Sequence, residues 1–247
     1  MRGILLDIEG TTTPIEFVYQ ALFPYVRLHL EQYLKRNLDS KELARDVLEL
    51  REEYVKDLAA ELAPPEWLVA PPEAQTESVV RYVFWLMDRD RKSTGLKSLQ
   101  GKIWQEGYLK GELKSQVFPD VPPALKDWKE KNLDVRIFSS GSVLAQKLLF
   151  ANTQAGDLSG FLNGYFDTEI GPKTSAESYC RIAAEFHLAA SEVLFVSDVI
   201  QELDAANNSG MKTLLSVRPG NPPQPKGHAQ GIISSFSEIH IDEAELI

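Results

Sequence analysis

Cysteine and histidine are scarce in this sequence of 247 residues, which contains one cysteine and four histidines. A single cysteine, Cys180, excludes an internal disulfide and a metal site made of thiolates. We expect it to be a small residue that is buried or half-buried and is not a nucleophile. The histidines lie far apart and lack the spacing of metal ligands; they are His29, His187, His228 and His240. Neither residue type therefore predicts a catalytic or metal-binding site.

Long apolar runs and dense basic stretches are also lacking. The first run, Ile4-Leu5-Leu6, meets Asp7 at once, so it is too short for a signal peptide. No stretch approaches the roughly 20 apolar residues of a membrane span. The 36 acidic residues outnumber the 26 basic ones, and the net charge of −10 disfavours a nucleic-acid partner. These features predict a soluble, cytoplasmic protein with no membrane and no nucleic-acid partner. We expect a monomer, because no long apolar stripe lacks an intramolecular use.

Short apolar runs recur along the chain and end in small or acidic polar residues. They span 3–7, 133–140, 192–198 and 211–217, and a last short strand is expected at 231–236. Amphipathic segments of helix length lie between the later runs; their stripes are Val143, Leu144, Leu148 and Leu149, and Tyr179, Ile182, Ala183 and Phe186. Strands that alternate with helices predict an α/β fold with a doubly wound, mainly parallel, Rossmann-like sheet, where ligands bind at the carboxyl ends of the strands. No glycine-rich dinucleotide or ATP loop follows any run.

Residues from about 17 to about 115 follow a helical period instead of a strand period. Apolar residues recur at i, i+4 and i+7; they are Leu43, Val47, Leu50, Tyr54 and Leu58 in one segment, and Val80, Val83, Phe84 and Met87 in another. After this region, one helix face carries Val121, Leu125 and Trp128. We therefore expect a core domain of residues 1–16 and 116–247, with an all-helical domain of residues 17–115 inserted after the first strand.

Two carboxylates, Asp7 and Glu9, stand one residue apart where the first apolar run ends, although their charges repel. Other expected strand ends also carry polar side chains; these are Ser139, Ser140, Lys173 and Asp198, with Glu202 four residues further on. Each has a structural explanation when taken alone, because Asp, Ser and Thr cap turns and helices. A solvated Lys173 would contribute less than about 0.5 kcal/mol to stability. The set is informative through its order along a doubly wound sheet with an early helical insertion.

Taken in this order, the polar residues resemble the motifs of the haloacid-dehalogenase-like hydrolases, and the resemblance spans the whole chain. Four segments are similar to the bifunctional enolase-phosphatases of methionine salvage, also called acireductone synthases; they are LLDIEGTTTPIEFV, FSSGSVLAQKLLF, GYFDTEIGPK followed by SAESY, and VRPGN. Most relatives carry two aspartates in the first motif. The second acid here is Glu9, which is typical of the enolase-phosphatases. The resemblance implies that the core domain is catalytic and that the helical domain is a cap.

The resemblance also implies a phosphoric monoester hydrolase that depends on magnesium and forms an aspartyl-phosphate. Its substrate would be a small phosphorylated diketone, 2,3-diketo-5-methylthiopentyl-1-phosphate, which is enolised and then dephosphorylated to the acireductone 1,2-dihydroxy-3-keto-5-methylthiopentene. Asp7 would be the nucleophile, and Glu9 the acid and base. One Mg²⁺ per subunit would be held by Asp7, Asp198 and the main-chain carbonyl of Glu9, and its charge would offset the repulsion between the acids.

The remaining polar residues would bind the phosphoryl group. Ser139 and Ser140 would donate hydrogen bonds to its oxygens, and Lys173 would add a fixed positive charge that also serves catalysis. Glu202 is expected to orient either the metal's water shell or Lys173. The base that enolises the substrate stays open between Glu9 and a residue of the cap, which is expected to close over the methylthio end of the substrate.

Other functions compete with this interpretation. A phosphatase of another small phosphate ester would share all of these residues and stays open as an alternative. A metal-free dehalogenase needs the nucleophile but no acid two positions later, so Glu9 counts against it. A binding module without catalysis would typically have lost Asp7, Lys173 or Asp198, and all three are present.

Overall fold

The computed structural model describes residues 1–225, 227 and 229–241. The chain forms two compact units, Met1–Val18 together with Lys114–Ile247, and Tyr19–Leu113. We call these unit 1 and unit 2. The boundaries expected from the sequence, after residue 16 and before residue 116, each differ from these by two residues. The roles expected for the two units, a catalytic core for unit 1 and a cap for unit 2, stay predictions. His228 lies outside the described residues.

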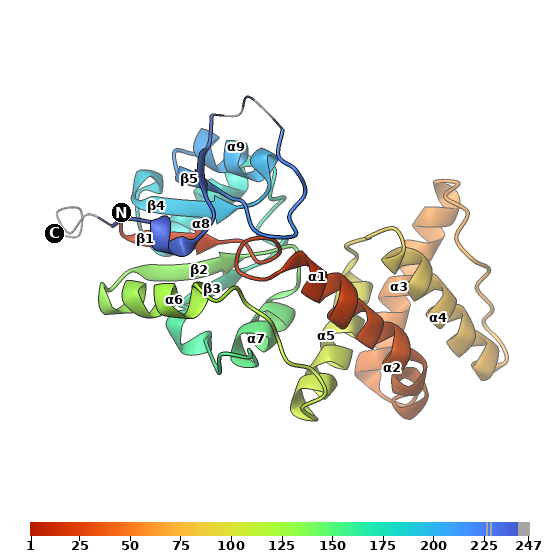
Figure 1. Cartoon of the computed structure of the whole chain (residues 1–247). Helices are drawn as coiled ribbons and strands as arrows, with labels where there is room; N and C mark the ends of the chain where they lie inside the picture. Colours follow the sequence, from red (N-terminus) through yellow and green to blue (C-terminus); the bar gives the residue numbers. More distant parts are fainter. Residues whose placement is uncertain (226, 228, 242–247) are drawn as a thin grey trace. The chain divides into compact units, whose positions relative to one another are not determined.

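Unit 1 is built on a six-stranded sheet in the order β3-β2-β1-β4-β5-β6, in which every neighbouring pair is parallel (Figure 1). The strands are β1 (Gly3–Leu6), β2 (Asp134–Phe138), β3 (Gly164–Phe166), β4 (Val193–Ser197), β5 (Lys212–Ser216) and β6 (Gly231–Ile233). The predicted parallel α/β sheet is confirmed. β3 is not among the expected strands, because its three half-buried residues are too few to show a period.

Helices cover both faces of this sheet, as a doubly wound fold requires. The helices of unit 1 are α1 (Ile15–Phe17), α6 (Val121–Glu130), α7 (Val143–Ala151), α8 (Ala176–Phe186) and α9 (Ile200–Asn208), with short 3-10 turns η2 (Ser159–Phe161), η3 (Ala190–Glu192) and η4 (Phe236–Glu238). Alternate residues of a strand point to opposite faces, so Ile4 and Leu6 pack in one hydrophobic cluster and Leu5 in the other. The first cluster includes residues of α6 and α7, and the second residues of α8 and α9 (Figure 1).

The amphipathic stripes predicted for unit 1 have different outcomes. Those on α6 and α8 are confirmed, since every residue of both stripes is buried. On α7, Leu149 is buried as predicted, but Leu144 is exposed and Gln146 is buried instead. The Gln146 side chain can be buried because its Nε2 donates to the carbonyls of Gly141 and Phe166, both at 2.8 Å.

The expectation that Cys180 is buried or half-buried is wrong, because its side chain is exposed. The inner face of α8 is formed by Tyr179, Ile182, Ala183 and Phe186. Cys180 follows Tyr179 and is therefore rotated by about 100° around the helix, which turns it away from the sheet.

The chain from Val18 to Leu113 contains helices and no strand. The helices are the π-helical turn η1 (Val18–Leu22), α2 (Phe23–Arg36), α3 (Lys41–Ala59), α4 (Pro72–Met87) and α5 (Thr94–Leu109). Serine side chains cap two of them, since Ser40 accepts from the Leu43 amide at the start of α3 and Ser93 from the Leu96 amide at the start of α5.

The apolar stripe predicted on α3 fails at its last residue, because Leu58 is 49% exposed. Asp57 is buried in its place. Its carboxylate accepts hydrogen bonds from the Tyr82 hydroxyl at 2.7 Å and from Arg91 Nη2 at 3.0 Å. These partners compensate for the lost hydration of the charge, so an acidic residue can replace an apolar one on the inner face.

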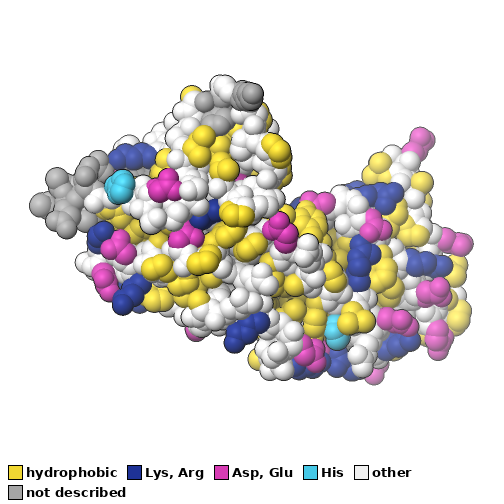
Figure 2. All heavy atoms as spheres, viewed as in Figure 1, with side chains coloured by type: hydrophobic (Ala, Val, Ile, Leu, Met, Phe, Trp, Pro, Cys, Tyr) yellow, Lys and Arg dark blue, Asp and Glu magenta, His cyan; other side chains and the backbone are white. Residues whose placement is uncertain are grey.

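Among the described residues, no helix has both the length and the apolar character needed to cross a membrane. On the face drawn in Figure 2, Lys and Arg side chains are interspersed with Asp and Glu side chains.

Candidate active site

The polar residues singled out in the sequence lie at the carboxyl edge of the sheet in unit 1. Asp7 follows β1, Ser139 follows β2 and Asp198 follows β4. β1 lies between β2 and β4, and the three strands are parallel. Their carboxyl ends therefore meet at one edge, with Asp7 in the middle.

A buried network of charged side chains centres on Lys173. Its Nζ donates to Asp7 Oδ1 at 2.7 Å and lies 2.6 Å from Glu202 Oε2. Ser197 Oγ donates to Glu202 Oε2 at 2.9 Å and accepts from the Val199 amide at 3.1 Å. The side chains of Lys173 and Asp7 are each 7% exposed, so water screens their attraction weakly. Two carboxylates thus share one ammonium group, and contact with Lys173 is one of the two roles expected for Glu202.

Lys173 reaches this position from the loop between β3 and α8. The Tyr179 hydroxyl donates to the Lys173 carbonyl at 2.7 Å, and Ser178 Oγ donates to the Pro172 carbonyl at 2.8 Å. Gly171, at φ +136°, allows this approach because a Cβ there would clash with Ser178 Oγ. The first turn of α8 therefore holds the main chain around Lys173. Since this lysine is buried, the solvated Lys173 considered from the sequence is contradicted.

The network shifts the acid–base properties of its members. Burial alone would lower the pKa of Lys173, but the charges of Asp7 and Glu202 outweigh burial and raise this pKa. Burial and the charge of Asp7 raise the pKa of Glu202 to about 7, although Lys173 opposes the shift. Burial and the charges of Asp7 and Glu202 also raise the pKa of Asp198 to about 7. The lysine thus stays charged, while the acids around it repel one another.

This excess of carboxylates fits a hard cation. Asp7 and Asp198 offer carboxylate oxygens, the ligands that Mg²⁺ prefers. A cation would offset the burial and the carboxylate repulsion that raise the pKa of Asp198. Within residues 1–225, 227 and 229–241, no three His, Cys, Asp or Glu side chains are arranged to hold a metal ion. The ligand set expected from the sequence needs only two such side chains, because its third protein ligand is the main-chain carbonyl of Glu9. The donor set present therefore fits Mg²⁺.

Glu9, Ser139 and Ser140 follow the ends of β1 and β2 at the same edge. The Ser139 amide donates to the Phe166 carbonyl at 3.2 Å, and Ser139 Oγ accepts from the Gly141 amide at 3.2 Å. Ser139 is therefore buried in the turn that leads into α7, whereas Glu9 and Ser140 are half-buried. The roles of these three residues toward a substrate stay predictions.

Sequence reasoning assigns no role to Arg218 or Asn221 of the VRPGN segment, yet both contact the loop that follows β1. Arg218 Nε donates to the Thr11 carbonyl at 3.2 Å, and Asn221 Nδ2 donates to the Gly10 carbonyl at 2.9 Å. A signal was available, because polar residues after a strand also marked the strand ends that carry Asp7, Ser139 and Asp198. It was weak here, since a segment rich in Pro and Gly is typical of a surface loop.

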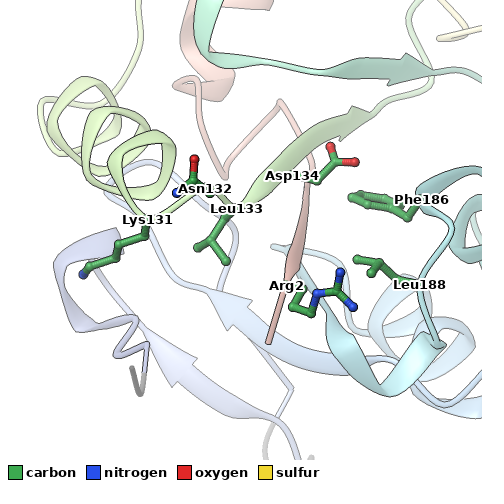
Figure 3. A pocket seen from close by; sticks show the side chains of 7 residues that line it. All are labelled: Arg2, Lys131, Asn132, Leu133, Asp134, Phe186 and Leu188. Atoms are coloured by element: carbon green, nitrogen blue, oxygen red, sulfur yellow. The ribbon is translucent and has the colours of Figure 1, made fainter. Parts of the chain in front are cut away.

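A cavity of about 670 Å³ lies at the opposite edge of the sheet, near the amino ends of β1 and β2 (Figure 3). Its charged side chains already have partners: Arg2 pairs with Glu192, Lys131 with Asp127, and Asp134 with Arg136. Ligands of parallel sheets bind at the carboxyl ends of the strands. We therefore assign the candidate active site to the edge that carries Asp7.

Comparison with known proteins identifies the family. Residues 1–210 match the family model of the haloacid dehalogenase-like hydrolases. Enolase-phosphatase E1 of Synechococcus elongatus is 53% identical over 236 residues, which cover 96% of this chain and 96% of that protein. Enolase-phosphatase E1 of Pseudomonas aeruginosa is 40% identical over 242 residues, which cover 98% of this chain and 99% of that protein.

A solved structure is also similar to this chain in sequence and in fold. The crystal structure of the UTR4 protein of Saccharomyces cerevisiae is 34% identical in sequence and has a TM-score of 0.76 to this chain. The similarity covers 96% of this chain and 99% of the yeast chain. The chain belongs to the haloacid dehalogenase-like hydrolases and, within them, to the enolase-phosphatase E1 family.

Proposed function

We propose that this chain is a Mg²⁺-dependent enolase-phosphatase of methionine salvage. It converts 2,3-diketo-5-methylthiopentyl-1-phosphate through the enol-phosphate to 1,2-dihydroxy-3-keto-5-methylthiopentene and inorganic phosphate. The observation that carries the proposal is the buried contact of 2.7 Å between Lys173 and Asp7 at the carboxyl edge, which sets a fixed positive charge beside a carboxylate nucleophile. The identity of 53% to an enolase-phosphatase E1 over 96% of the chain supports the substrate.

Dephosphorylation proceeds in two displacement steps. A carboxylate oxygen of Asp7 attacks phosphorus, the bond from phosphorus to the substrate oxygen breaks, and Glu9 gives its proton to that oxygen. A water molecule then attacks the phosphorus of the aspartyl-phosphate, and Glu9 takes a proton from the water. The bond from phosphorus to Asp7 breaks, which releases inorganic phosphate and restores both carboxyl groups.

Lys173, Ser139 and Ser140 stabilise the phosphoryl group during transfer. Because the charges around it raise the pKa of Lys173, this side chain stays positive near neutral pH and attracts the phosphoryl oxygens. The serine hydroxyls donate hydrogen bonds to the same oxygens. Glu202, 2.6 Å from Lys173 Nζ, keeps the lysine in place as the charge on Asp7 changes.

Asp7, Asp198 and the main-chain carbonyl of Glu9 would hold one Mg²⁺ per subunit. When bound, the ion would supply positive charge to the phosphoryl group and would polarise the carbonyl oxygen of the substrate. Gln224 Nε2 donates to the main-chain carbonyl of Asp198 at 3.2 Å. This contact helps to hold the second carboxylate in position.

Enolisation requires a base that removes a proton from the carbon next to a carbonyl group. Glu9 is the candidate within unit 1, because it is half-buried and lies two residues after Asp7. The electron pair of the broken C–H bond passes to the carbonyl oxygen, which takes a proton from solvent to become the enol. Glu9 keeps the proton from carbon and gives it to the leaving oxygen in the next step. The proton that Glu9 later takes from the attacking water returns to solvent at the end of the cycle. A base among residues 17–115 is the alternative to Glu9.

The alternative is a phosphatase of another small phosphate ester, because such an enzyme needs the same residues around phosphorus. Phosphate release should be measured with the diketone phosphate, phosphoglycolate and several sugar phosphates at equal concentrations. The proposal requires kcat/KM to be highest for the diketone phosphate. A higher value for any of the other esters would replace it with the alternative.

The proposal extends to a cytoplasmic monomer whose partner is the small-molecule substrate, without nucleic acid or membrane. The net charge of −10 supports the exclusion of nucleic acid, since a phosphate backbone would be repelled. Light scattering after gel filtration tests the monomer, which has a mass of 27.7 kDa. Twice that mass would contradict it.

A further inference from the structure

The loop that follows β1 is held by a segment that comes from a distant strand. β5 ends at Ser216, and residues 217–221 reach Gly10, although β4 separates β5 from β1 in the sheet. Asn221 Nδ2 donates to the Gly10 carbonyl at 2.9 Å, and Ser216 Oγ donates to the same carbonyl at 3.2 Å. Figure 1 shows this dark blue segment beside the red loop after β1. The segment thus passes the end of β4, which Asp198 follows.

These contacts restrain both peptide groups that flank Gly10. Gly10 has φ +67°, a left-handed conformation that favours glycine. Its amide donates to the Thr13 carbonyl at 2.8 Å, while its carbonyl is held by Asn221. In a planar trans peptide the carbonyl points opposite to the next N–H, so the Glu9 carbonyl points away from Thr13. Only the φ and ψ angles of Gly10 separate the peptide plane before it from the peptide plane after it. The hydrogen bond from Asn221 to the Gly10 carbonyl therefore also restrains the peptide group that contains the Glu9 carbonyl.

The orientation of the Asn221 side chain follows from its neighbours. Nδ2 faces two acceptors, the carbonyl oxygens of Gly10 at 2.9 Å and Ser216 at 3.3 Å. If the amide were flipped, Oδ1 would face these two oxygens and no hydrogen bond could form. Oδ1 is buried and has no donor among the described residues. A Cβ on Gly10 would clash with Asp198 Oδ2 and would lie 2.9 Å from Asn221 Oδ1. Both oxygens therefore adjoin the same small volume beside Gly10.

We propose that Asn221 is a positioning residue of the magnesium site. Its Nδ2 holds the turn at Gly10, which directs the Glu9 carbonyl to an ion beside the Asp198 carboxylate. The inference rests on the proposed function, because it takes Mg²⁺ as the cofactor. Residues that orient metal ligands typically change metal affinity about 10- to 100-fold when they are replaced, and Ser216 keeps one hydrogen bond to Gly10. Loss of Asn221 should therefore weaken Mg²⁺ binding about tenfold.

The test is calorimetric titration of the metal-free full chain with Mg²⁺, without substrate. Wild type, Asn221→Ala and the matched control Asn208→Ala are compared, since Asn208 is an exposed asparagine at the end of α9. We expect Asn221→Ala to raise the Kd for Mg²⁺ about tenfold, with the control unchanged. In turnover, Asn221→Ala should lose kcat at low Mg²⁺ and recover most of it at saturating Mg²⁺.

A lower melting temperature of Asn221→Ala with an unchanged Kd for Mg²⁺ would show a structural role only and overturn the proposal. If Asn221→Ala does not fold, Asn221→Leu, which has a similar size but no donor, takes its place in the titration, and the same rise in the Kd for Mg²⁺ is expected. A wild type that binds Mg²⁺ but releases no phosphate from any ester refutes the proposed function, while the Kd comparison still decides the role of Asn221. A wild type that binds no Mg²⁺ refutes both.

Discussion

Replacement of Lys173 is expected to destabilise unit 1 as well as stop phosphate release. The ammonium group lies 2.7 Å from Asp7 and 2.6 Å from Glu202 in a buried site. In Lys173→Met the space stays filled, but both carboxylates lose their cation. Loss of one partner of a buried ion pair costs about 3–5 kcal/mol, and 1 kcal/mol shifts the melting temperature of a domain of this size by about 2–4 °C. We therefore expect the melting temperature to fall by about 6 to 20 °C at pH 8.

The destabilisation of Lys173→Met should be smaller at pH 6. Burial and the charge of Asp7 already raise the pKa of Glu202 to about 7, and Lys173 opposes this shift, so removal of Lys173 raises the pKa further. A carboxyl group with a raised pKa in the folded state contributes stability that is fully present below its unfolded pKa. This contribution is lost as the pH rises through the folded value. Glu202 therefore takes up a proton at pH 6 and removes one of the two uncompensated charges.

Thermal unfolding followed by circular dichroism, in EDTA at pH 6 and pH 8, measures both effects. Lys126→Met is the matched control, because the Lys126 side chain is 69% exposed, and it should melt like wild type. The double variant Lys173→Met with Glu202→Gln should recover part of the loss at pH 8. A melting temperature of Lys173→Met within about 2 °C of wild type at both pH values would refute the buried network as a source of stability.

Three further predictions concern the nucleophile and the metal. Asp7→Asn should lower phosphate release by several orders of magnitude, because an amide cannot attack phosphorus, while the absorbance of the enol still rises at high Mg²⁺; release within about tenfold of wild type would exclude Asp7 as the nucleophile. A chelator should abolish phosphate release and added Mg²⁺ should restore it, whereas full turnover in excess EDTA after exhaustive metal removal would rule out the mechanism. Mg²⁺ should raise the melting temperature more at pH 8 than at pH 6. Burial and the charges of Asp7 and Glu202 raise the pKa of Asp198 to about 7. The stability that a protonated Asp198 gives the metal-free protein is lost above that pH, so Mg²⁺ can add more stability at pH 8. Equal gains at both pH values would contradict that assignment.

Local patterns predicted the sheet and most helix faces, because these depend on neighbours along the chain. The stripe of Val121, Leu125 and Trp128 is buried on α6 as its helical spacing indicates. The common edge of Asp7 and Asp198 also followed from sequence, since parallel strands carry their carboxyl ends at one edge. The three residues of β3 were too short a run to predict.

Partners far apart in the sequence explain most of what could not be predicted. Asp57 is buried on α3 because Arg91, 34 residues later, pairs with it. Lys173 has the sequence environment of a surface lysine, and its contacts with Asp7, 166 residues away, and with Glu202 account for its burial. The contact of Asn221 spans 211 residues to the loop after β1. No periodicity records such pairings, because they arise when the sheet assembles.

One site is expected to perform both half-reactions, and a single time course tests this most directly. Wild-type protein with Mg²⁺ and the diketone phosphate should be followed by ultraviolet absorbance and by free phosphate in the same reaction. The expected result is a conjugated enol whose absorbance rises before phosphate appears. Phosphate release from the diketone phosphate with no preceding enol, or release from other esters only, would contradict the enolase-phosphatase assignment.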